Sequence, residues 1–270
     1  MIEYRSIAKT FADGTEAVGD FSLQLPSRTT TVLVGSSGCG KTTLLRMVNR
    51  MVEPTHGQVL IDDVDVATRN PVELRRSIGY VMQETGLLPH RTVVDNVAAV
   101  LRLKGVDKKE ARDRARTVLE TVGLDPSLSG KYRAQLSGGQ QQRVGVARGL
   151  VTDPNVLLMD EPFGAVDPIV RDELRQELLR LQKDLDKTIV FVTHDIDEAF
   201  LLGDQVVILQ KGGKIAQIGS PTEILANPAD DFVRSFVGLD KGQRTLHVEE
   251  RDGQQVVVDA HGKATGVLAG

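Results

Sequence analysis

The sequence predicts an α/β fold built around a mostly parallel sheet. Short runs rich in β-branched residues alternate with segments of helical periodicity, which is typical of α/β layering. Three of these runs, "TTTVLVG", "NVLLMDE" and "TIVFVTH", are almost continuously apolar. Strands of this composition are usually parallel and covered on both faces. We therefore expect one sheet with other elements packed on both of its sides.

The strands and helices of the first half follow in order. The run from Thr29 to Gly35 is a buried strand that ends at a glycine, and "TTLLRMVNRM" after it is a helix. "IGYVMQ", from Ile78 to Gln83, is the next strand. The character then changes, because no strand is evident between the residues at 92 and 135. There, "KKEARDRARTVLETVGL" aligns one apolar stripe, made of Ala111, Ala115, Val118, Leu119 and Val122. We expect a helical subdomain over about residues 92–150.

The second half returns to strands and ends in a polar tail. After "NVLLMDE", a helix is expected with Asp167 as its N-cap and Pro168 in its first position. "HDIDEAFLLGD" predicts a short helix that stops at Gly203, and "QVVILQKGGKIAQIG" predicts a hairpin. We place the main domain at residues 1–239. Residues 240–270 form a short tail, expected to be a small hairpin or partly disordered.

Composition narrows the class of protein. Among 270 residues, 33 are basic and 37 acidic, giving a net charge of −4. This balance, with no tryptophan, argues against nucleic acid as the main partner. The single cysteine, Cys39, excludes an intrachain disulfide and fits a reducing compartment. The start lacks the apolar core of a signal peptide, and no apolar run approaches the ~18 residues that span a bilayer. We expect any work at a membrane to go through a partner.

A phosphate-binding loop is the strongest single signal. "GSSGCGKT" fits the pattern G-x-x-x-x-G-K-[ST] and lies directly between a strand and a helix, the context that the motif requires. Its glycines let backbone N–H groups turn toward phosphate oxygens, and the helix N-terminus adds partial positive charge. Lys41 would reach the β- and γ-phosphates, and the Thr42 hydroxyl would ligate Mg²⁺. Cys39, inside the loop, is interpreted as a small filler rather than a nucleophile.

Polar residues follow three other strands. Asp160 ends "VLLMD" and Glu161 comes next, where ligands bind in open α/β sheets. Asp160 fits a Mg²⁺-associated carboxylate, and Glu161 fits a base for an attacking water. Each residue alone could simply solvate a strand end. Gln83 and His194 end two further strands, however, and the same ends of parallel strands share one edge. We expect all of them around one Mg²⁺–triphosphate.

A second glycine-rich loop, "LSGGQQQR", follows the helical subdomain and starts a helix with Ser137 as a plausible N-cap. Two glycines before a helix N-terminus make an anion site. Its subdomain is expected to hold it away from the first loop. Two chains packed head to tail would solve this, with each phosphate loop facing the other chain's "LSGGQ".

In order and spacing, "GSSGCGKTT", "LSGGQQQR", "VLLMDEP", "GAVD" and "THD" resemble the ATP-binding subunits of ABC transporters over residues 2–239. The resemblance implies a P-loop NTPase core with an N-terminal antiparallel β part and an inserted helical subdomain. It implies catalytic roles for Lys41, Gln83, Glu161 and His194, and a Mg²⁺ site near Thr42, Gln83 and Asp160. It also implies a set of nucleotide-binding residues: Phe11, Gly35, Ser36, Ser37, Gly38, Cys39, Gly40, Lys41, Thr42, Thr43, Ser137, Gly138, Gly139, Gln140 and Asp167. Phe11 would stack on adenine, although a core phenylalanine is an alternative.

A finer resemblance is carried by "RMVNRMVEPTHG", "YVMQETGLLPHRTV" and "FGAVDPIVRDELR". These segments are similar to the ATPases of quaternary-amine uptake systems, which import glycine betaine, choline, carnitine or related osmoprotectants. Amino-acid, sulfonate and sugar importers share much of the pattern and stay as alternatives. Many members of the quaternary-amine group carry a paired regulatory CBS module after the ATPase. Residues 240–270 are too few to form one.

The resemblance implies the partners as well. They are ATP, Mg²⁺, a second copy of the chain, an integral membrane permease and, indirectly, an extracytoplasmic solute-binding protein. The chain would lie peripherally on the cytoplasmic face of the inner membrane. A soluble ABC protein that clamps nucleic acid would show a long coiled-coil insertion or strong basic patches, and neither is seen. A P-loop kinase would have no use for "LSGGQ". A non-catalytic ABC scaffold is disfavoured by Lys41, Asp160, Glu161 and His194.

Overall fold

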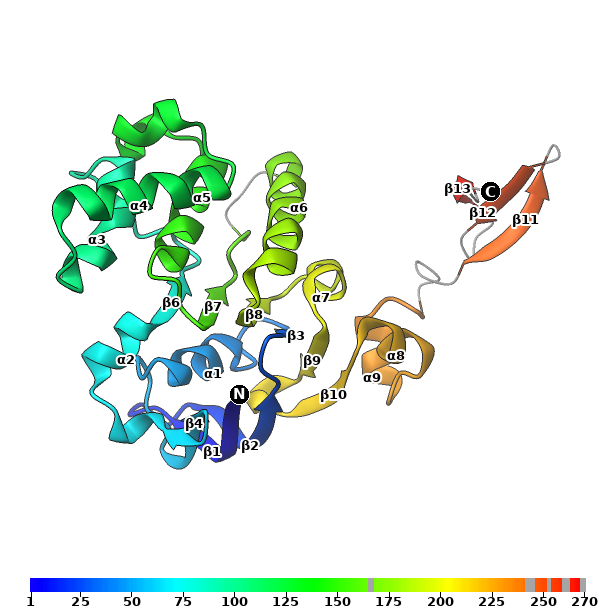
Figure 1. The fold of residues 1–270 in the computed structure, drawn as a ribbon. Coiled ribbons are helices and arrows are strands. Elements are labelled where there is room, and N and C mark those ends of the chain that lie inside the picture. The colour runs from blue at the N-terminus through cyan, green and yellow to red at the C-terminus, as the bar shows by residue number, and fades with distance from the viewer. Residues whose placement is uncertain (165–167, 241–245, 252–253, 259–262, 268–270) are drawn as a thin grey trace.

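A computed structural model describes residues 1–164, 168–240, 246–251, 254–258 and 263–267 (Figure 1). Their strands form three sheets of six, four and three strands. The six-stranded sheet has the order β10-β9-β3-β8-β7-β6. Its neighbouring pairs are parallel except for the β9–β10 hairpin. Its strands are β3 (Thr30–Gly35), β6 (Ile78–Val81), β7 (Val156–Asp160), β8 (Thr188–Thr193), β9 (Gln205–Leu209) and β10 (Ile215–Gly219).

Alternation along the central strands feeds two separate cores. In β3, Val32 and Val34 belong to one buried cluster, whereas Leu33 between them belongs to the other. β8 repeats the pattern, with Phe191 in the first cluster and Val190 in the second. Successive side chains of a strand point to opposite faces. The sheet is therefore covered on both sides, which explains why its strands read as continuous apolar runs.

An antiparallel sheet covers one face together with α1 (Lys41–Val48) and α2 (Pro71–Ser77). Its strands have the order β2-β1-β4-β5. Tyr4 of this sheet packs edge-on against Phe21, with ring centroids 5.4 Å apart. The α1 helix ends earlier than "TTLLRMVNRM" suggests, because Arg50 takes a left-handed conformation with φ 55°. The bounds are β1 (Ile2–Thr10), β2 (Glu16–Leu25), β4 (His56–Ile61) and β5 (Val64–Asp65), followed by the 3₁₀ turn η1 (Val66–Thr68).

Helices inserted between β6 and β7 form the upper part of Figure 1. They are α3 (Val93–Leu103), α4 (Lys108–Thr121) and α5 (Gly138–Leu150), with the 3₁₀ turns η2 (Pro126–Gly130) and η3 (Arg133–Gln135). Ala111, Ala115 and Leu119 of the predicted stripe are buried in the first core cluster. Asp95 of α3 makes a two-pronged ion pair with Arg112 of α4, both N···O distances being 2.7 Å. Arg112 holds the pKa of the Asp95 carboxyl below its usual range.

After β7, helices alternate with the remaining strands of the central sheet and then follow them. These helices and turns are α6 (Pro168–Leu185), α7 (Ile196–Leu202), η4 (Lys211–Gly213), α8 (Pro221–Ala226) and α9 (Asp231–Phe236). The described residues of the tail form the three-stranded antiparallel sheet β11 (His247–Arg251), β12 (Gln254–Val258) and β13 (Ala264–Val267). Among the described helices, none is both long and apolar enough to cross a bilayer.

Candidate functional site

The predicted polar residues meet at one edge of the central sheet. Gly35 ends β3, Asp160 ends β7, and His194 follows the last residue of β8. Gln83 lies two residues beyond the end of β6. β3, β8, β7 and β6 are adjacent and parallel, so these ends share one side. A cavity of about 440 Å³ opens there. Its lining is Thr15, Glu16, Ala17, Ser37, Gly38, Gly40, Lys41, Thr42, Thr43, Gln83, Glu161 and Lys211.

Two positions in the loop require glycine. Gly40 has φ 104°, and a Cβ there would lie 2.7 Å from the Ala17 carbonyl oxygen. A Cβ at Gly35 would overlap the Leu209 carbonyl oxygen of β9. The loop is further tied to the β9–β10 turn, because the Gly213 amide donates to the Cys39 carbonyl at 2.9 Å. Cys39 is buried against this turn, which supports its interpretation as a filler.

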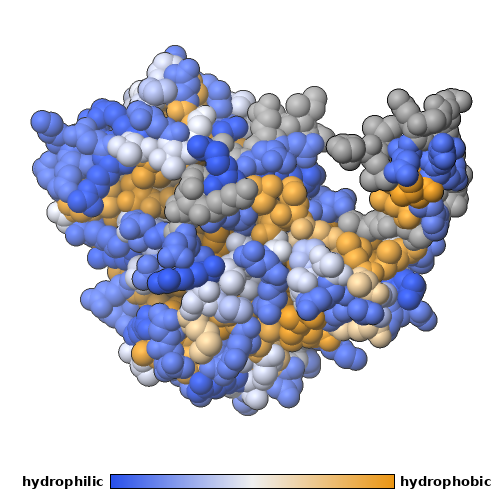
Figure 2. All heavy atoms as spheres, turned by 45° about the vertical axis from the view of Figure 1, so that its right-hand side comes forward, coloured by the Kyte–Doolittle hydropathy of each residue, from blue (hydrophilic) through white to orange (hydrophobic). Residues whose placement is uncertain are grey.

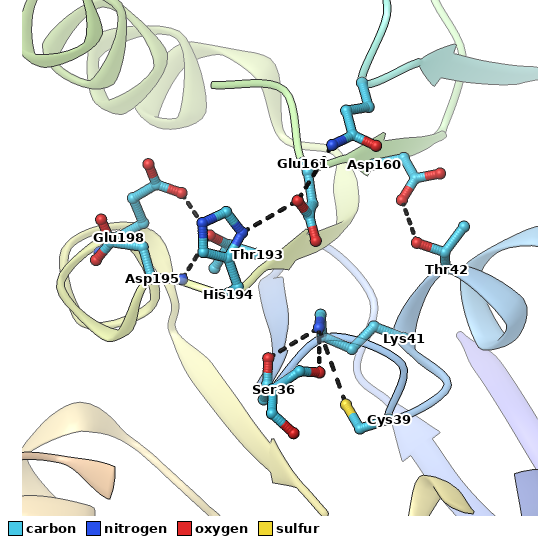
Figure 3. A network of polar contacts seen from close by, with 12 residues as sticks. Ser36, Cys39, Lys41, Thr42, Asp160, Glu161, Thr193, His194, Asp195 and Glu198 are labelled. Atoms are coloured by element: carbon cyan, nitrogen blue, oxygen red, sulfur yellow. Dashed lines mark hydrogen bonds and ion pairs between the residues drawn. The ribbon is translucent and has the colours of Figure 1, made fainter. Parts of the chain in front are cut away.

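Lys41 is folded over the loop (Figure 3). Its side chain is almost fully buried, and Nζ donates to the carbonyls of Gly35 at 2.8 Å and Ser36 at 2.9 Å. Lys41 is also the first residue of α1. A buried ammonium group and the free N–H groups of a helix N-terminus are thus brought to the floor of one cavity. This arrangement favours an anion with several oxygens, such as a polyphosphate.

Asp160 lies beside the next residue of the loop. The Thr42 hydroxyl donates to Asp160 Oδ1 at 2.7 Å, as Figure 3 shows. Asp160 Oδ2 accepts from the Tyr80 hydroxyl at 3.1 Å and from Arg46 at 3.3 Å. Burial raises the pKa of the Tyr80 phenol, and the Asp160 charge raises it further. The phenol therefore keeps its proton and can donate.

The oxygen atoms of Thr42 and Asp160 fit a magnesium ion better than a metal whose ligands all come from the protein. Thr42 and Asp160 supply a hydroxyl and a carboxylate oxygen, the hard ligands that Mg²⁺ prefers. Among the described residues, no group of three or more His, Cys, Asp or Glu side chains could hold a metal. Mg²⁺ commonly takes one or two protein ligands and completes its shell with water and phosphate oxygens.

Glu161 has an unusual backbone and two polar neighbours. It is one of the few non-glycine residues with positive φ, at 44°, and its amide donates to the Val192 carbonyl at 2.9 Å. Its Oε2 lies 3.4 Å from Gln83 Nε2 and 3.0 Å from His194 Nδ1. Strained backbone held by its surroundings is common at active sites. Glu161 thus contacts both Gln83 and His194. Figure 3 shows its contact with His194.

A buried network supports the segment that carries His194. The Thr193 hydroxyl donates to Glu198 Oε2 at 2.6 Å and accepts from the Asp195 amide at 3.0 Å. Arg175 of α6 donates to Glu198 at 2.8 Å and to Asp195 at 2.9 Å. Three elements, α6, β8 and α7, are locked together next to the histidine. Arg175 and Glu198 lie in the segments "FGAVDPIVRDELR" and "HDIDEAFLLGD". Nothing in either segment indicates that the two side chains meet.

Phe11 lies in the turn between β1 and β2 and does not line the cavity. Phe11 is 40% exposed. Lys9 Nζ lies 5.2 Å from the ring centroid, within the range of a cation–π contact. The role of Phe11 in binding adenine stays a prediction.

The second glycine-rich loop is separate from this cavity. Ser137 caps α5 by accepting from the Gln140 amide, and the Gln140 side chain accepts from the Ser137 amide. Gly138 and Gly139 form the first turn of that helix. The cavity over the phosphate loop has no lining residue from 137–140. Asp167, predicted to contribute to the nucleotide site and to cap α6, lies outside the described residues.

Arg46, Tyr80 and Lys211 were also missed by sequence reasoning. Arg46 lies one helical turn after Thr42 on α1, a spacing that places both on the same face. Tyr80 alternates with buried Gly79 and Val81 on β6. Periodicity could therefore place Arg46 on one face of α1 and Tyr80 on one face of β6. No motif indicated which residues these two side chains would contact. Lys211 reaches the cavity from a turn far along the chain.

The loop, the buried carboxylate and the Glu161–His194 pair on a parallel sheet are the arrangement of a P-loop nucleoside triphosphatase. The family model described as "ABC transporter" matches residues 18–164. The chain belongs to the ABC transporter family, as an ATP-binding cassette of its ATPase class.

Curated relatives and solved structures agree with this assignment. The choline transport ATP-binding protein OpuBA of Bacillus subtilis is 47% identical over 89% of this chain and 63% of its own length. The carnitine transport ATP-binding protein OpuCA of Listeria monocytogenes is 47% identical over 89% of this chain and 60% of its own. The chain thus spans about three fifths of these two relatives. The glycine betaine uptake system ATP-binding protein YehX of Escherichia coli is 45% identical over 88% of this chain and 77% of its own length.

Among solved structures, a dimeric ATP-binding cassette in a post-hydrolysis state bound to ADP and Pi is 32% identical. It matches with a TM-score of 0.74 over 82% of this chain and 99% of its own. CbiO1 of Clostridium perfringens, part of an ABC transporter complex, matches with a TM-score of 0.76 at 30% identity. The match extends over 88% of this chain and 94% of CbiO1. Both likenesses extend to sequence, so they support the family as well as the fold.

Proposed function

We propose that this chain binds and hydrolyses ATP to power an ABC importer of quaternary-amine osmoprotectants such as glycine betaine, choline or carnitine. The observation that carries the chemistry is one cavity lined by Lys41, Thr42 and Glu161. Thr42 is bonded to Asp160, and Glu161 contacts His194. The substrate class is supported by three relatives at 45–47% identity, which are choline, carnitine and glycine betaine transport or uptake proteins.

Each residue has a role that its position supports. Lys41 and the α1 N-terminus bind the triphosphate, and Thr42 with Asp160 holds Mg²⁺, which neutralises phosphate charge when bound. Glu161 accepts a proton from the attacking water, while Gln83 and His194 orient that water and the γ-phosphate. Phe11 stacks on adenine. Gly35, Ser36, Ser37, Gly38, Gly40 and Thr43 supply the cradle.

We infer that two copies work head to tail. The α5 N-terminus is a capped helix start carrying Gly138 and Gly139, and it lies outside the lining of its own chain's cavity. Such a start favours a phosphate brought by another molecule. One solved relative is dimeric, which supports two copies working together.

A groove on the helical subdomain supports docking to a permease. It has a volume of about 340 Å³ and is predominantly basic, with Arg91, Arg102 and Lys108 beside the Asp95–Arg112 pair. The segment between Gln83 and His90 joins this groove to the ATP cavity. Arg148 of α5 fixes that segment by donating to the Gly86 carbonyl at 2.9 Å. We propose that an acidic permease loop binds here and senses Gln83.

The molecular surface fits a peripheral location. The face in Figure 2 is mostly hydrophilic, with separate apolar patches. We propose that the chain lies on the cytoplasmic face of the inner membrane, attached through the permease. The permease in turn receives solute from an extracytoplasmic binding protein.

The test is solute uptake in the native cell. Disruption of the gene should abolish high-salt uptake of radiolabelled glycine betaine, choline or carnitine, and the wild-type gene should restore it. A gene carrying Lys41→Ala should not, because the triphosphate loses its buried ammonium partner. Uptake of histidine and of a sugar serves as the control. Loss of one of those, with quaternary-amine uptake intact, would contradict the proposed substrate class.

A further inference from the structure

Three side chains from three elements form a closed triangle behind the phosphate loop. Arg46 of α1 donates through Nε to the Tyr80 hydroxyl oxygen at 3.3 Å and through Nη2 to Asp160 Oδ2 at 3.3 Å. Tyr80 of β6 donates its own proton to the same Oδ2 at 3.1 Å. Because Arg46 occupies the acceptor side of the Tyr80 oxygen, the phenolic proton is directed toward Asp160.

The Asp160 carboxylate is buried, so its oxygens depend on the partners in this triangle. Asp160 is only 2% exposed, and a buried carboxylate is costly unless its oxygens are paired. Thr42 pairs with Oδ1 alone, at 2.7 Å. Without Arg46 and Tyr80, Oδ2 would lose both contacts described for it. The carboxylate would then rotate toward other donors and leave Thr42.

We propose that Arg46 and Tyr80 are a positioning pair that fixes the orientation of the Asp160 carboxylate for the Mg²⁺ of the bound nucleotide. The pair holds Oδ2, so that Oδ1 stays in line with the Thr42 hydroxyl. Thr42 then spends its single proton on Asp160, and its oxygen lone pairs stay available to the cation. This inference rests on the proposed function, because it requires a Mg²⁺–nucleotide at Thr42.

A purely structural role makes a different prediction. Arg46 and Tyr80 also connect α1 to β6, and loosening that contact would weaken nucleotide binding whether or not Mg²⁺ is present. A positioning role instead weakens only the part of binding that Mg²⁺ contributes. The discriminating quantity is the ratio of nucleotide affinities measured with Mg²⁺ and with EDTA.

The experiment uses the full chain and a non-hydrolysable ATP analogue with an imido bridge between the β- and γ-phosphorus atoms. Its affinity is measured by calorimetry in excess Mg²⁺ and in EDTA, for wild type, Tyr80→Phe and Arg46→Lys. We expect Tyr80→Phe to lower the Mg²⁺/EDTA affinity ratio roughly ten-fold, as outer-shell partners of metal ligands do. Arg46→Lys should also lower it, since one ammonium group cannot contact Tyr80 and Asp160 in the same fork geometry.

Tyr4→Phe is the matched control. It removes another tyrosine hydroxyl that is fully buried and bonded, to the Leu44 carbonyl at 3.1 Å, but has no contact with Asp160. It should leave the ratio unchanged even if it lowers the melting temperature. An unchanged ratio in Tyr80→Phe, or an equal loss with and without Mg²⁺, would overturn the inference and leave the proposed function standing. A wild-type chain that binds no analogue would instead contradict the proposed function itself.

Discussion

At the scale of single residues, Glu161 contacts two of the other proposed catalytic residues. Its left-handed backbone and the hydrogen bond that its amide donates to the Val192 carbonyl place the carboxylate beside Gln83 and His194. The preceding residue, Asp160, is the last residue of β7, and its carboxylate accepts from Thr42. Two neighbouring carboxylates thus serve different partners, because the strand ends at Asp160 and the backbone turns at Glu161, where φ is 44°.

Glu161→Gln should keep ATP affinity and slow hydrolysis by about 10²–10⁴-fold, because an amide of the same shape cannot accept the proton of the water. Turnover is measured by phosphate release and affinity by calorimetry. With hydrolysis blocked, ATP should hold two chains together, and size-exclusion chromatography should show a dimer that separates when nucleotide is removed. Turnover at the wild-type rate would rule out Glu161 as the base.

At the scale of elements, hydrogen bonds connect α6 to the segment that carries His194. Arg175 is 14% exposed and bridges to Glu198, which is 6% exposed and holds Thr193 beside His194. A link of this kind transmits any displacement of α6 to β8 and α7. It couples α6, none of whose described side chains lines the cavity, with the residue that contacts Glu161.

Arg175→Ala should therefore affect both stability and catalysis. Removing one partner of a buried pair typically costs about 3–5 kcal/mol in the free energy of unfolding. The rate of hydrolysis should fall while the KM for ATP changes little, since Lys41 and Thr42 are untouched.

Arg114→Ala is the control, because Arg114 pairs with Glu110 on the exposed side of α4. It should cost only about 0.3–0.5 kcal/mol. Urea unfolding and steady-state kinetics measure both variants. Similar losses from the two substitutions would show that the Arg175 network carries no special coupling.

At the scale of the whole molecule, the separation between the two glycine-rich loops predicts function in trans. Lys41→Ala damages one loop and Ser137→Arg the other, so each homodimer has two damaged sites. A mixed dimer of the two variants contains one site with an intact phosphate loop facing an intact Ser137 loop. Mixing the two inactive proteins should restore ATP hydrolysis at that site.

Tagged co-purification verifies that the chains have exchanged partners, and phosphate release reports the activity. Nucleotide trapping on the mixed dimer shows whether the intact site is occupied. If both loops of a site came from the same chain, every site in the mixture would stay damaged. Hydrolysis and trapping that both stay at background after proven exchange would therefore contradict the head-to-tail arrangement.

Local patterns in the sequence were enough for central strands of the sheet, the phosphate loop and the family. Continuous β-branched runs predicted β3, β7 and β8, because burial on both faces removes polar residues from a strand. "GSSGCGKT" predicted the phosphate loop, because its glycines allow backbone conformations that other residues rarely adopt, such as φ 104° at Gly40. Ser137 was predicted as an N-cap for the same reason, since capping involves residues only three positions apart.

Only the tertiary structure decided which distant side chains meet. Tyr80 and Arg46 reach Asp160 across separations of 80 and 114 residues, and Arg175 reaches Glu198 across 23. No local pattern encodes such pairs, because they follow from the order β9-β3-β8-β7-β6 and from the helices packed on it. The sequence by itself determined the class of protein and its motif residues. The tertiary structure decided how those residues are held, because strand order brings together side chains that the chain keeps far apart.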